Sequence, residues 1–246
     1  KHCKMKICGA QTRPVKGNIQ QNIENHKKLI NLAVVNGADI IIFPELSITG
    51  YEPELAQELA THVEDPRFDD FQEISDAQQL TIGVGMPIKN ETGISIGMIL
   101  FQPNQARQLY EKKYLHADEE PFFISGQSTV SLIGDKKNVA LAICYELSVP
   151  EHSENAYKSG AEIYIASVAK TADGVEKAAK TLTEIAKNYS MTVFMSNCVG
   201  YCDNFESVGR SAIWNNQGIL VEQLNGIKEG VLIFDTDTQE VIAITI

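Results

Sequence analysis

The sequence predicts an α/β protein built in layers, and three observations lead to this prediction. Segments with strand character alternate with amphipathic helical segments throughout the 246 residues, which is the pattern of sheets covered by helices. The composition, with 43% hydrophobic residues, is that of an ordinary globular protein with one sizeable core. No internal repeat and no low-complexity segment interrupts the alternation. We therefore expect one domain spanning residues 1–246.

The first predicted elements lead to an acidic residue. Residues 6–11 have the character of a strand, and Asn18 is a favourable N-cap for a helix that Gly37 ends. The apolar positions of this helix recur at helical spacing, namely Ile19, Ile23, Ile30, Ala33 and Val34. The strand that follows is strongly apolar and is expected to end at Glu45.

The remaining elements continue the alternation, with one exception. A second amphipathic helix is expected over residues 68–79, and three consecutive strands follow it, near residues 81–86, 94–102 and 107–112. Because strands that follow one another directly pair antiparallel, part of the sheet should be antiparallel. Later helices and strands are expected at residues 150–159, 162–167, 175–189 and 192–197, with mostly strands from residue 211 and a turn at residues 216–218.

The charge and hydropathy of the chain exclude two classes of partner. The formal net charge is −11, and no cluster of basic residues is present that could bind nucleic-acid phosphates. No apolar run is long enough to span a bilayer, and no basic segment followed by a hydrophobic stretch opens the chain. We therefore expect no nucleic acid and no membrane as partners, and a cytoplasmic location. The segment 1–4 is expected to lie partly upstream of a natural start at Met5.

The cysteines and glycines give no sign of a metal or an organic cofactor. The five cysteines, at positions 3, 8, 144, 198 and 202, are odd in number and scattered, which fits a reducing compartment. Cys198 and Cys202 have the spacing of half a metal site, but no second ligand pair lies near them. We expect two partly buried thiols at a strand end and its loop. Gly83-Val-Gly85 lacks the third glycine and the helix of a dinucleotide fingerprint.

One strand ends abruptly at a cysteine. The apolar residues 139–143 stop at Cys144, and Pro150 and Glu151 then open a helix. A strand that ends in a tight turn before a helix exposes its last side chain at the edge of a sheet, where backbone N–H groups face what that side chain attacks. Cys144 therefore has the setting of a nucleophile. On this segment alone, a small buried hydrophobe is an equally good interpretation.

Two other apolar strands also end near a single ionisable residue. The first leads to Phe43-Pro44-Glu45, followed by Gly50-Tyr51, and the second contains Tyr110-Glu111-Lys112-Lys113-Tyr114-Leu115. Together with Ile143-Cys144-Tyr145-Glu146 and the later Pro150-Glu151, they resemble the three catalytic motifs of the nitrilase (carbon–nitrogen hydrolase) superfamily. Each motif alone is weak. Three motifs in the right order and spacing, across most of the chain, make a specific signal.

The resemblance implies a fold, an assembly and a chemistry. The fold is a four-layer α-β-β-α sandwich, and such subunits usually pair through their helical faces, so we expect a homodimer or a higher homo-oligomer. The implied catalytic triad is Glu45, Lys112 and Cys144, which would hydrolyse a carbon–nitrogen bond other than a peptide bond through a cysteinyl thioester. The expected substrate is a small amide or an N-carbamoyl compound, with nitrile hydrolysis by the same triad as the alternative.

The residue types suit this chemistry without reference to the family. Hydrolysing an amide needs a nucleophile, a base that takes and returns its proton, and a positive group where negative charge develops. Cys144, Glu45 and Lys112 supply these in turn, and enclosure should raise the pKa of Glu45. The Lys112 ammonium should lower the pKa of the Cys144 thiol and favour its thiolate. The backbone N–H of Tyr145 is a further oxyanion donor, and Tyr51 is a candidate substrate-binding residue.

Two positions have close competitors. Adjacent strand residues point to opposite faces, so only one of Lys112 and Lys113 can enter the site, and the flanking family motif selects Lys112. The family also uses an accessory glutamate after the lysine to orient it. Counting back from the aromatic pair and glycine favours Glu119, with Glu120 left open.

The chain departs from the commonest family pattern in two places. Many members have arginine where Ser148 stands, so no substrate contact is assumed there. Many have histidine where Tyr114 stands, which should change only the packing. The match extends to two late signatures, Asn197 with Gly200 and Gly209 with Ser211.

Two other functions compete with this interpretation. A cysteine hydrolase with a histidine base could use only His116 or His152, and neither lies in a recognisable cysteine–histidine motif. A binding protein that kept the fold but lost turnover should lack a triad residue, and all three are present. Selectivity for the acyl group should depend on the loops at residues 116–128 and 170–174.

Overall fold

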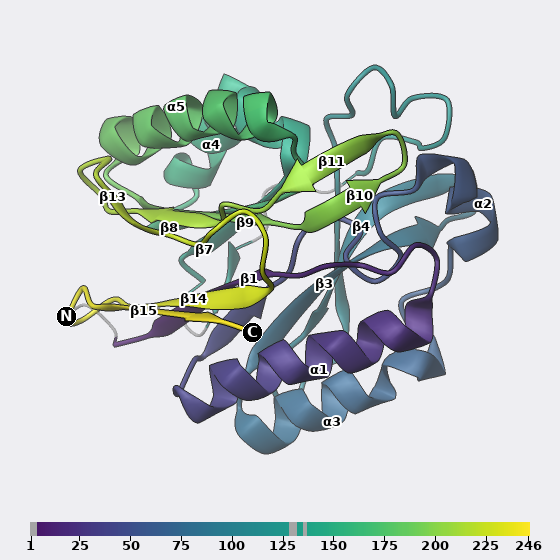
Figure 1. Ribbon diagram of the computed structural model, residues 1–246, viewed down its shortest axis with the longest axis horizontal. Coiled ribbons are helices and arrows are strands. Elements are labelled where there is room, and N and C mark those ends of the chain that lie inside the picture. Colours follow the sequence, from purple (N-terminus) through teal and green to yellow (C-terminus); the bar gives the residue numbers. More distant parts are fainter. Residues whose placement is uncertain (1–3, 128–131, 135–136) are drawn as a thin grey trace.

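The protein is a sandwich of four layers. The computed structural model describes residues 4–127, 132–134 and 137–246, so Cys3 and most of the segment before Met5 lie outside the described residues. Figure 1 shows helices α4 and α5 over one sheet, which lies on a second sheet whose outer face is covered by α1 and α3. The predicted four-layer α-β-β-α sandwich is confirmed. Within the described ranges, every helix is too short or too polar to cross a membrane.

The helices and strands have the following bounds. The strands are β1 (Lys6–Gln11), β2 (Ile40–Ile42), β3 (Thr81–Lys89), β4 (Ile94–Phe101), β5 (Gln108–Glu111), β6 (Leu132–Ile133), β7 (Val139–Ile143), β8 (Ile163–Val168), β9 (Thr192–Asn197), β10 (Val199–Cys202), β11 (Phe205–Val208), β12 (Ala212–Trp214), β13 (Leu220–Gln223), β14 (Gly230–Asp235) and β15 (Val241–Thr245). The α-helices are α1 (Ile19–Val35), α2 (Ala56–Leu59), α3 (Asp69–Gln78), α4 (Pro150–Lys158) and α5 (Ala172–Tyr189). The 3₁₀ turns are η1 (Pro53–Leu55), η2 (Pro66–Phe68) and η3 (Cys144–Ser148).

The strand order brings three strand ends to one edge of the sandwich. One sheet has the order β15-β14-β1-β2-β3-β4-β5 and the other the order β13-β12-β9-β8-β7-β6. β2 is parallel to β3, whereas β3, β4 and β5 pair antiparallel, as their succession in the sequence predicts. β5 therefore runs in the same direction as β2. In the other sheet, β7, β8 and β9 are parallel. The predicted site residues follow the carboxyl ends of β2, β5 and β7.

Alternating side chains supply an apolar surface on both faces of each sheet. In β2, Ile40 and Ile42 pack between the sheets, while Ile41 packs beneath α1 and α3. In β7, Leu141 faces the other sheet and Ala142 faces the layer of α4 and α5. Because both faces are buried, these strands are continuous apolar runs in the sequence. The rigid ends of such strands hold the site.

Two of the element boundaries that differ from the predicted ones bear on the site. β2 ends three residues before Glu45 rather than at it, because Pro44 cannot donate to a sheet ladder. α5 begins three residues before position 175, because the Thr171 hydroxyl caps it by accepting a hydrogen bond from the N–H of Gly174 at 3.2 Å. The predicted cap at Asn18 is confirmed for α1. The early start of α5 brings its first turn to the site.

Candidate active site

Four of the predicted residues meet at one end of the sandwich. Lys112 follows β5 directly, and its Nζ lies 2.8 Å from Oε1 of Glu45 and 2.7 Å from Oε1 of Glu119. All three side chains are at most 1% exposed. Cys144 follows β7, and its thiol interacts with the Glu45 carboxylate. The structure thus brings together four residues that come from both sheets and from the segment after β5.

Burial separates the two competing lysines. Lys112 is fully buried, whereas Lys113 is exposed and its Nζ lies 5.2 Å from the ring centroid of Tyr114. The backbone alternation of β5 therefore continues through Lys112, and one lysine enters the site while the next leaves it. Tyr114, at the position where many family members have histidine, also packs its ring edge-to-face on His152.

The accessory carboxylate is Glu119 in this structure, and Glu120 is exposed. Oε1 of Glu119 accepts hydrogen bonds from Lys112 and, at 3.0 Å, from the hydroxyl of Tyr51. Its Oε2 accepts from the backbone N–H of His116 at 2.8 Å. Glu119 is therefore the second carboxylate partner of the Lys112 ammonium, and it links Tyr51 to the site.

Glu45 is a buried carboxyl group with one free oxygen. Its Oε2 has no hydrogen-bond partner among the residues that the structure describes. Burial raises the pKa of Glu45, and the charge of Lys112 offsets part of this rise. Burial alone would lower the pKa of Lys112, but the charges of Glu45, Cys144 and Glu119 raise it above its ordinary value. Lys112 therefore stays an ammonium, and Glu45 is suited to accept a proton.

The ionisation of Cys144 differs from the expectation. Part of its side chain opens to solvent, but the sulfur is enclosed, and burial raises the pKa of the thiol to about 11. The charge of Glu45 raises it as well, while Lys170 and Lys112 lower it. The expectation of a resting thiolate beside Lys112 is therefore wrong, because burial outweighs the lysine. At neutral pH Cys144 is therefore a thiol, and the carboxyl group of Glu45, whose pKa is raised, lies beside it.

The backbone at Cys144 forms a strained turn. Its φ is +47°, in the left-handed region that residues with a Cβ rarely adopt. Tyr145 is the second residue of η3, so its backbone N–H has no partner within the turn. The ring of Tyr145 is 39% exposed and packs edge-to-face on His116 at 5.3 Å. This local geometry is that of a nucleophile followed by a free N–H donor.

A cavity of about 530 Å³ adjoins Cys144. Tyr51 and Phe205, whose ring centroids lie 5.6 Å apart, form one wall of it. The other lining side chains that bear on the chemistry are Tyr145, Phe122, Lys170 and Glu119. The cavity joins the buried ionisable cluster to solvent, so a small molecule can reach the thiol.

Lys170 is a cation of this cavity; the sequence pointed to its loop, residues 170–174, but not to the lysine itself. It precedes α5, and its backbone is held by Asn197, whose Oδ1 accepts from the Lys170 N–H at 3.0 Å and whose Nδ2 donates to the Lys170 carbonyl at 3.3 Å. The side-chain Nδ2 of Asn197 also donates to the carbonyl of Gly209. The backbone N–H of Asn197 donates to the hydroxyl oxygen of Ser211. Asn197, Gly209 and Ser211, which belong to the late family signatures, thus fix the backbone at Lys170 through hydrogen bonds. The resemblance pointed to Asn197, but no sequence signal paired it with Lys170.

Among the described residues, His116 lines the same cavity as Cys144, but no histidine is hydrogen-bonded to the thiol as in a cysteine–histidine hydrolase. His116 is exposed and its Nδ1 lies 2.5 Å from Oδ1 of Asp118. His152 is buried, and its two ring nitrogens are taken up by the hydroxyls of Tyr110 and Tyr164. Neither imidazole has a hydrogen bond to the thiol among the described contacts. Ser148, where many members have arginine, is exposed.

Cys198 and Cys202 are more deeply buried than expected. Both are 1% exposed, and their sulfurs lie 3.6 Å apart. The second one ends strand β10 rather than lying in a loop, and Gly200, with a φ of +97°, bends the chain between them. Over the described residues, no group of three or more potential metal ligands gathers here or elsewhere.

Comparisons with known proteins agree with the fold. The family model described as "Carbon-nitrogen hydrolase" matches residues 6–245. Glutamine-dependent NAD(+) synthetase of Acinetobacter baylyi is 26% identical, with 96% of this chain covering 44% of that protein. The chain therefore spans less than half the length of this relative. A protein of Staphylococcus aureus named "Hydrolase in agr operon" is also 26% identical, with 82% and 80% of the two chains covered.

Solved structures of an amidase from Nesterenkonia sp. AN1 resemble the chain in three dimensions. A cysteine-to-alanine mutant of it in complex with butyramide matches with a TM-score of 0.85 at 19% identity, covering 96% of this chain and 92% of that one. Another mutant, with the acetamide moiety of fluoroacetamide added covalently at its active-site cysteine, matches with a TM-score of 0.84 at 20% identity, covering 94% and 90%. With the family model matched over almost the whole chain, this protein belongs to the carbon–nitrogen hydrolase family.

Proposed function

We propose that the chain hydrolyses a small amide or an N-carbamoyl compound through a thioester on Cys144, with Glu45 and Lys112 completing the triad. The observation that carries this proposal is the buried cluster of Glu45, Lys112 and Glu119 beside a thiol at the end of a cavity. A buried ammonium between two carboxylates is costly to maintain. It is useful where a base and a positive charge are both needed next to a nucleophile.

The acylation step follows from the protonation states. Glu45 takes the proton of the Cys144 thiol as the sulfur attacks the carbonyl carbon. The oxygen becomes negative and is stabilised by Lys112 and the backbone N–H of Tyr145. When the intermediate collapses, Glu45 gives its proton to the departing nitrogen, which leaves as ammonia. The acyl group remains on sulfur as a thioester.

The second half of the reaction uses the same base. Glu45, again ionised, removes a proton from a water molecule, which attacks the thioester carbon. Lys112 and Tyr145 stabilise the negative oxygen once more. Collapse returns the proton from Glu45 to the sulfur and releases a carboxylic acid. The steps need only side chains and water.

The size of the cavity and the names of the relatives support an amide as substrate. A volume of about 530 Å³ suits a small molecule. Relatives include a glutamine-dependent synthetase and a deaminated glutathione amidase, whose names both refer to amide compounds. Nitrile hydrolysis by the same triad is the second candidate within the class, and a binding protein without turnover is the candidate outside it.

We propose in addition that the subunits form a homodimer or a higher homo-oligomer through the outer face of α4 and α5. Tyr157 on α4 is 53% exposed and lies 5.2 Å from the ring of Tyr189 on α5. Aromatic residues are enriched at such interfaces. Light scattering of the wild type and of Tyr157→Asp would test this, and a monomer in both would contradict it.

A panel assay tests the proposed reaction. Ammonia release is measured with small primary amides, N-carbamoyl compounds and nitriles, with Cys144→Ala as the control. We expect hydrolysis of at least one amide or N-carbamoyl compound by the wild type and none by Cys144→Ala, whose thermal stability should be nearly unchanged. A tenth or more of wild-type turnover in Cys144→Ala would exclude the thioester. Binding of an amide without turnover by the wild type would favour the non-catalytic candidate.

A further inference from the structure

Glu146 lies next to the reaction but takes no part in the proposed steps. It is the third residue of η3, the turn that Cys144 opens, and its side chain is fully buried. A buried carboxylate is unfavourable unless hydrogen bonds compensate for its lost hydration. The donors that surround Glu146 therefore indicate what it is for.

Each oxygen of Glu146 holds the backbone of one catalytic strand. Oε2 accepts a hydrogen bond at 2.9 Å from the N–H of Ile143, the residue before Cys144. Oε1 accepts at 2.7 Å from the N–H of Lys113, the residue after Lys112. The strands concerned, β7 and β5, belong to different sheets and are not paired with each other. The carboxylate therefore links directly two strand ends that no sheet ladder joins.

Three buried side chains keep Glu146 in this orientation. Tyr110 donates its O–H to Oε2 at 2.6 Å. Burial lowers the pKa of His152, so its ring is neutral at pH 7. One tautomer then satisfies every contact, with Nε2–H donating to the oxygen of Tyr110 and Nδ1 accepting from the hydroxyl of Tyr164, both at 2.9 Å. The carboxylate thus accepts hydrogen bonds from the hydroxyl of Tyr110 and from backbone N–H groups, including a longer one at 3.5 Å from Tyr114.

The strained turn of the nucleophile needs such a restraint. The left-handed conformation of Cys144 is unfavourable for a residue with a Cβ and persists only where its surroundings impose it. The bond from Ile143 to Glu146 closes this turn, and the bond from Lys113 fixes the strand end that carries Lys112. A shift of roughly 1 Å in either reacting group can cost about 100-fold in rate.

We propose that Glu146 is a positioning residue. Its carboxylate joins the ends of β5 and β7 through hydrogen bonds and thereby sets the position of Lys112 relative to Cys144. The inference rests on the proposed function, because the placement of Lys112 relative to Cys144 matters for catalysis only if these two residues carry out the proposed reaction. Glutamine cannot replace this carboxylate, since its NH2 group would face one of the two backbone N–H donors. Aspartate would be too short by about one C–C bond, roughly 1.5 Å.

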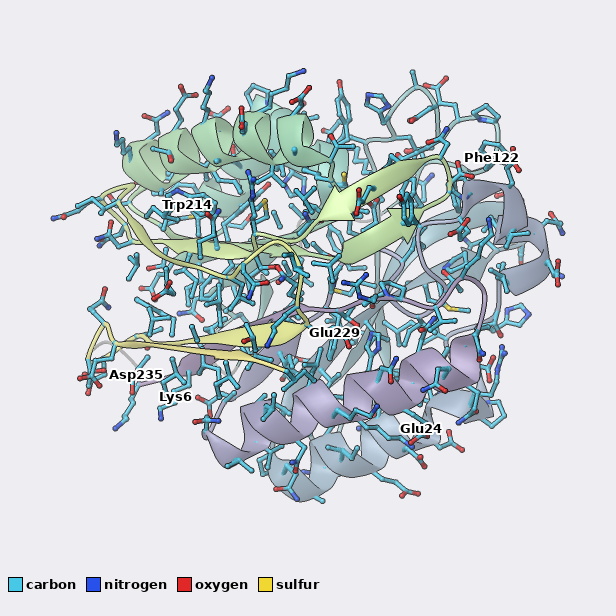
Figure 2. The ribbon with its side chains drawn as sticks, in the orientation of Figure 1. Lys6, Glu24, Phe122, Trp214, Glu229 and Asp235 are labelled. Atoms are coloured by element: carbon cyan, nitrogen blue, oxygen red, sulfur yellow. The ribbon has the colours of Figure 1, made fainter. Side chains whose placement is uncertain are left out.

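The test compares Glu146→Gln with a matched control, Asp235→Asn. Asp235 is 9% exposed, and its Oδ1 likewise accepts two backbone hydrogen bonds, from the N–H groups of Asp237 and Thr238. Figure 2 shows Asp235 at the opposite end of the molecule from Phe122, which lines the cavity. Both variants lose a buried carboxylate that holds backbone, but only one of them lies at the site.

We expect Glu146→Gln to lower kcat about 100-fold while KM stays within about threefold, and Asp235→Asn to change neither by more than about threefold. Iodoacetamide labelling with peptide mass mapping adds a readout that needs no substrate. Cys144 should be labelled faster at pH 8 in Glu146→Gln, because a loosened turn exposes its sulfur and lowers its pKa. Labelling of buried Cys198 should stay unchanged, which distinguishes local loosening from unfolding.

Equal kcat values for the two variants, or unchanged labelling of Cys144, would overturn the proposal. If Glu146→Gln does not fold, Glu146→Asp takes its place, with a smaller loss of kcat expected and a wild-type kcat overturning the proposal. Failure of the proposed function looks different, because the wild type would then show no turnover, or Cys144→Ala would retain hydrolysis, whatever residue stands at position 146.

Discussion

The ammonium of Lys112 and the carboxylate of Glu45 lie 2.8 Å apart, and neither side chain is exposed to solvent. A buried ion pair adds little net stability, because the loss of hydration roughly cancels the attraction. Removing one partner is costly, since it leaves the other charge buried and unpaired. The pair is therefore best explained by the chemistry at Cys144, and variants of the two residues should affect turnover and stability in different ways.

The adjacent lysines provide the first prediction. Lys112→Ala should lower kcat by about 100- to 1,000-fold through loss of oxyanion stabilisation. It should also lower the free energy of unfolding by about 3–5 kcal/mol, because Glu45 and Glu119 lose their shared cation. Lys113→Ala, which removes an exposed side chain, should change kcat by less than about threefold. Steady-state kinetics and urea unfolding measure both effects, and a reversed order would exclude Lys112 as the oxyanion donor.

The second prediction concerns the base. Glu45→Gln keeps the volume of the side chain but cannot deprotonate water, so it should acylate slowly and then stall at the thioester. Intact-protein mass spectrometry after incubation with a substrate whose leaving group needs little protonation should show the acyl mass on the protein. The adduct should be absent when Cys144→Ala is combined with Glu45→Gln. Wild-type turnover by Glu45→Gln would mean that another base acts, and Glu119 would be the next candidate.

The third prediction is the pH dependence of hydrolysis. Burial raises the pKa of Glu45, and the proposed mechanism needs its ionised form, so activity should fall as the pH drops through this raised pKa. The acid limb of kcat/KM should therefore lie above the ordinary glutamate value of about 4.5. The raised pKa of Lys112 keeps its charge through the alkaline range, so its deprotonation should add no limb below about pH 10. An acid limb at or below pH 4.5 would contradict this role of Glu45.

The fourth prediction concerns Lys170. Its charge lowers the pKa of the Cys144 thiol, so Lys170→Met should raise that pKa further above 11. Iodoacetamide labelling of Cys144 at pH 9 should then be slower by about threefold or more. Lys177→Met, which removes an exposed charge from α5 outside the cavity lining, serves as the control. Equal labelling rates in the two variants would show that Lys170 does not act on the thiol.

Much of the fold could be predicted because the local signals were strong. Buried strands such as β7 are uninterrupted apolar runs, and α1 carries both a capping asparagine and a regular apolar stripe. The start of α5 was harder to predict, because Gly174 is a poor helix former. The capping hydrogen bond, which the Thr171 hydroxyl accepts from the N–H of Gly174, is visible only in the structure. The hairpin of β10 and β11 was missed for a related reason. Its strands are short, and the bend at Gly200 interrupts their pattern.

Only those residues of the candidate site that belong to a family motif could be predicted from the sequence. Glu45, Lys112 and Cys144 each follow a strand and match a family motif, so their convergence was expected. The pKa of Cys144 was not, since it depends on the balance between burial and several charges at distances that a sequence does not contain. Lys170 belongs to no motif, and Glu146 lies inside one whose pattern says nothing about what its carboxylate binds.

The division of the site between two sheets has a consequence for folding. Glu45 and Lys112 come from one sheet and Cys144 from the other, and Glu45 and Cys144 are 99 positions apart in the sequence. Each sheet can form its own ladders without the other, but the cluster exists only after the two have stacked. Contacts of such long sequence separation form late, because the loops between them must close first. During refolding, recovery of hydrolysis should therefore lag behind the recovery of secondary structure, and it reports docking of the sheets rather than their formation.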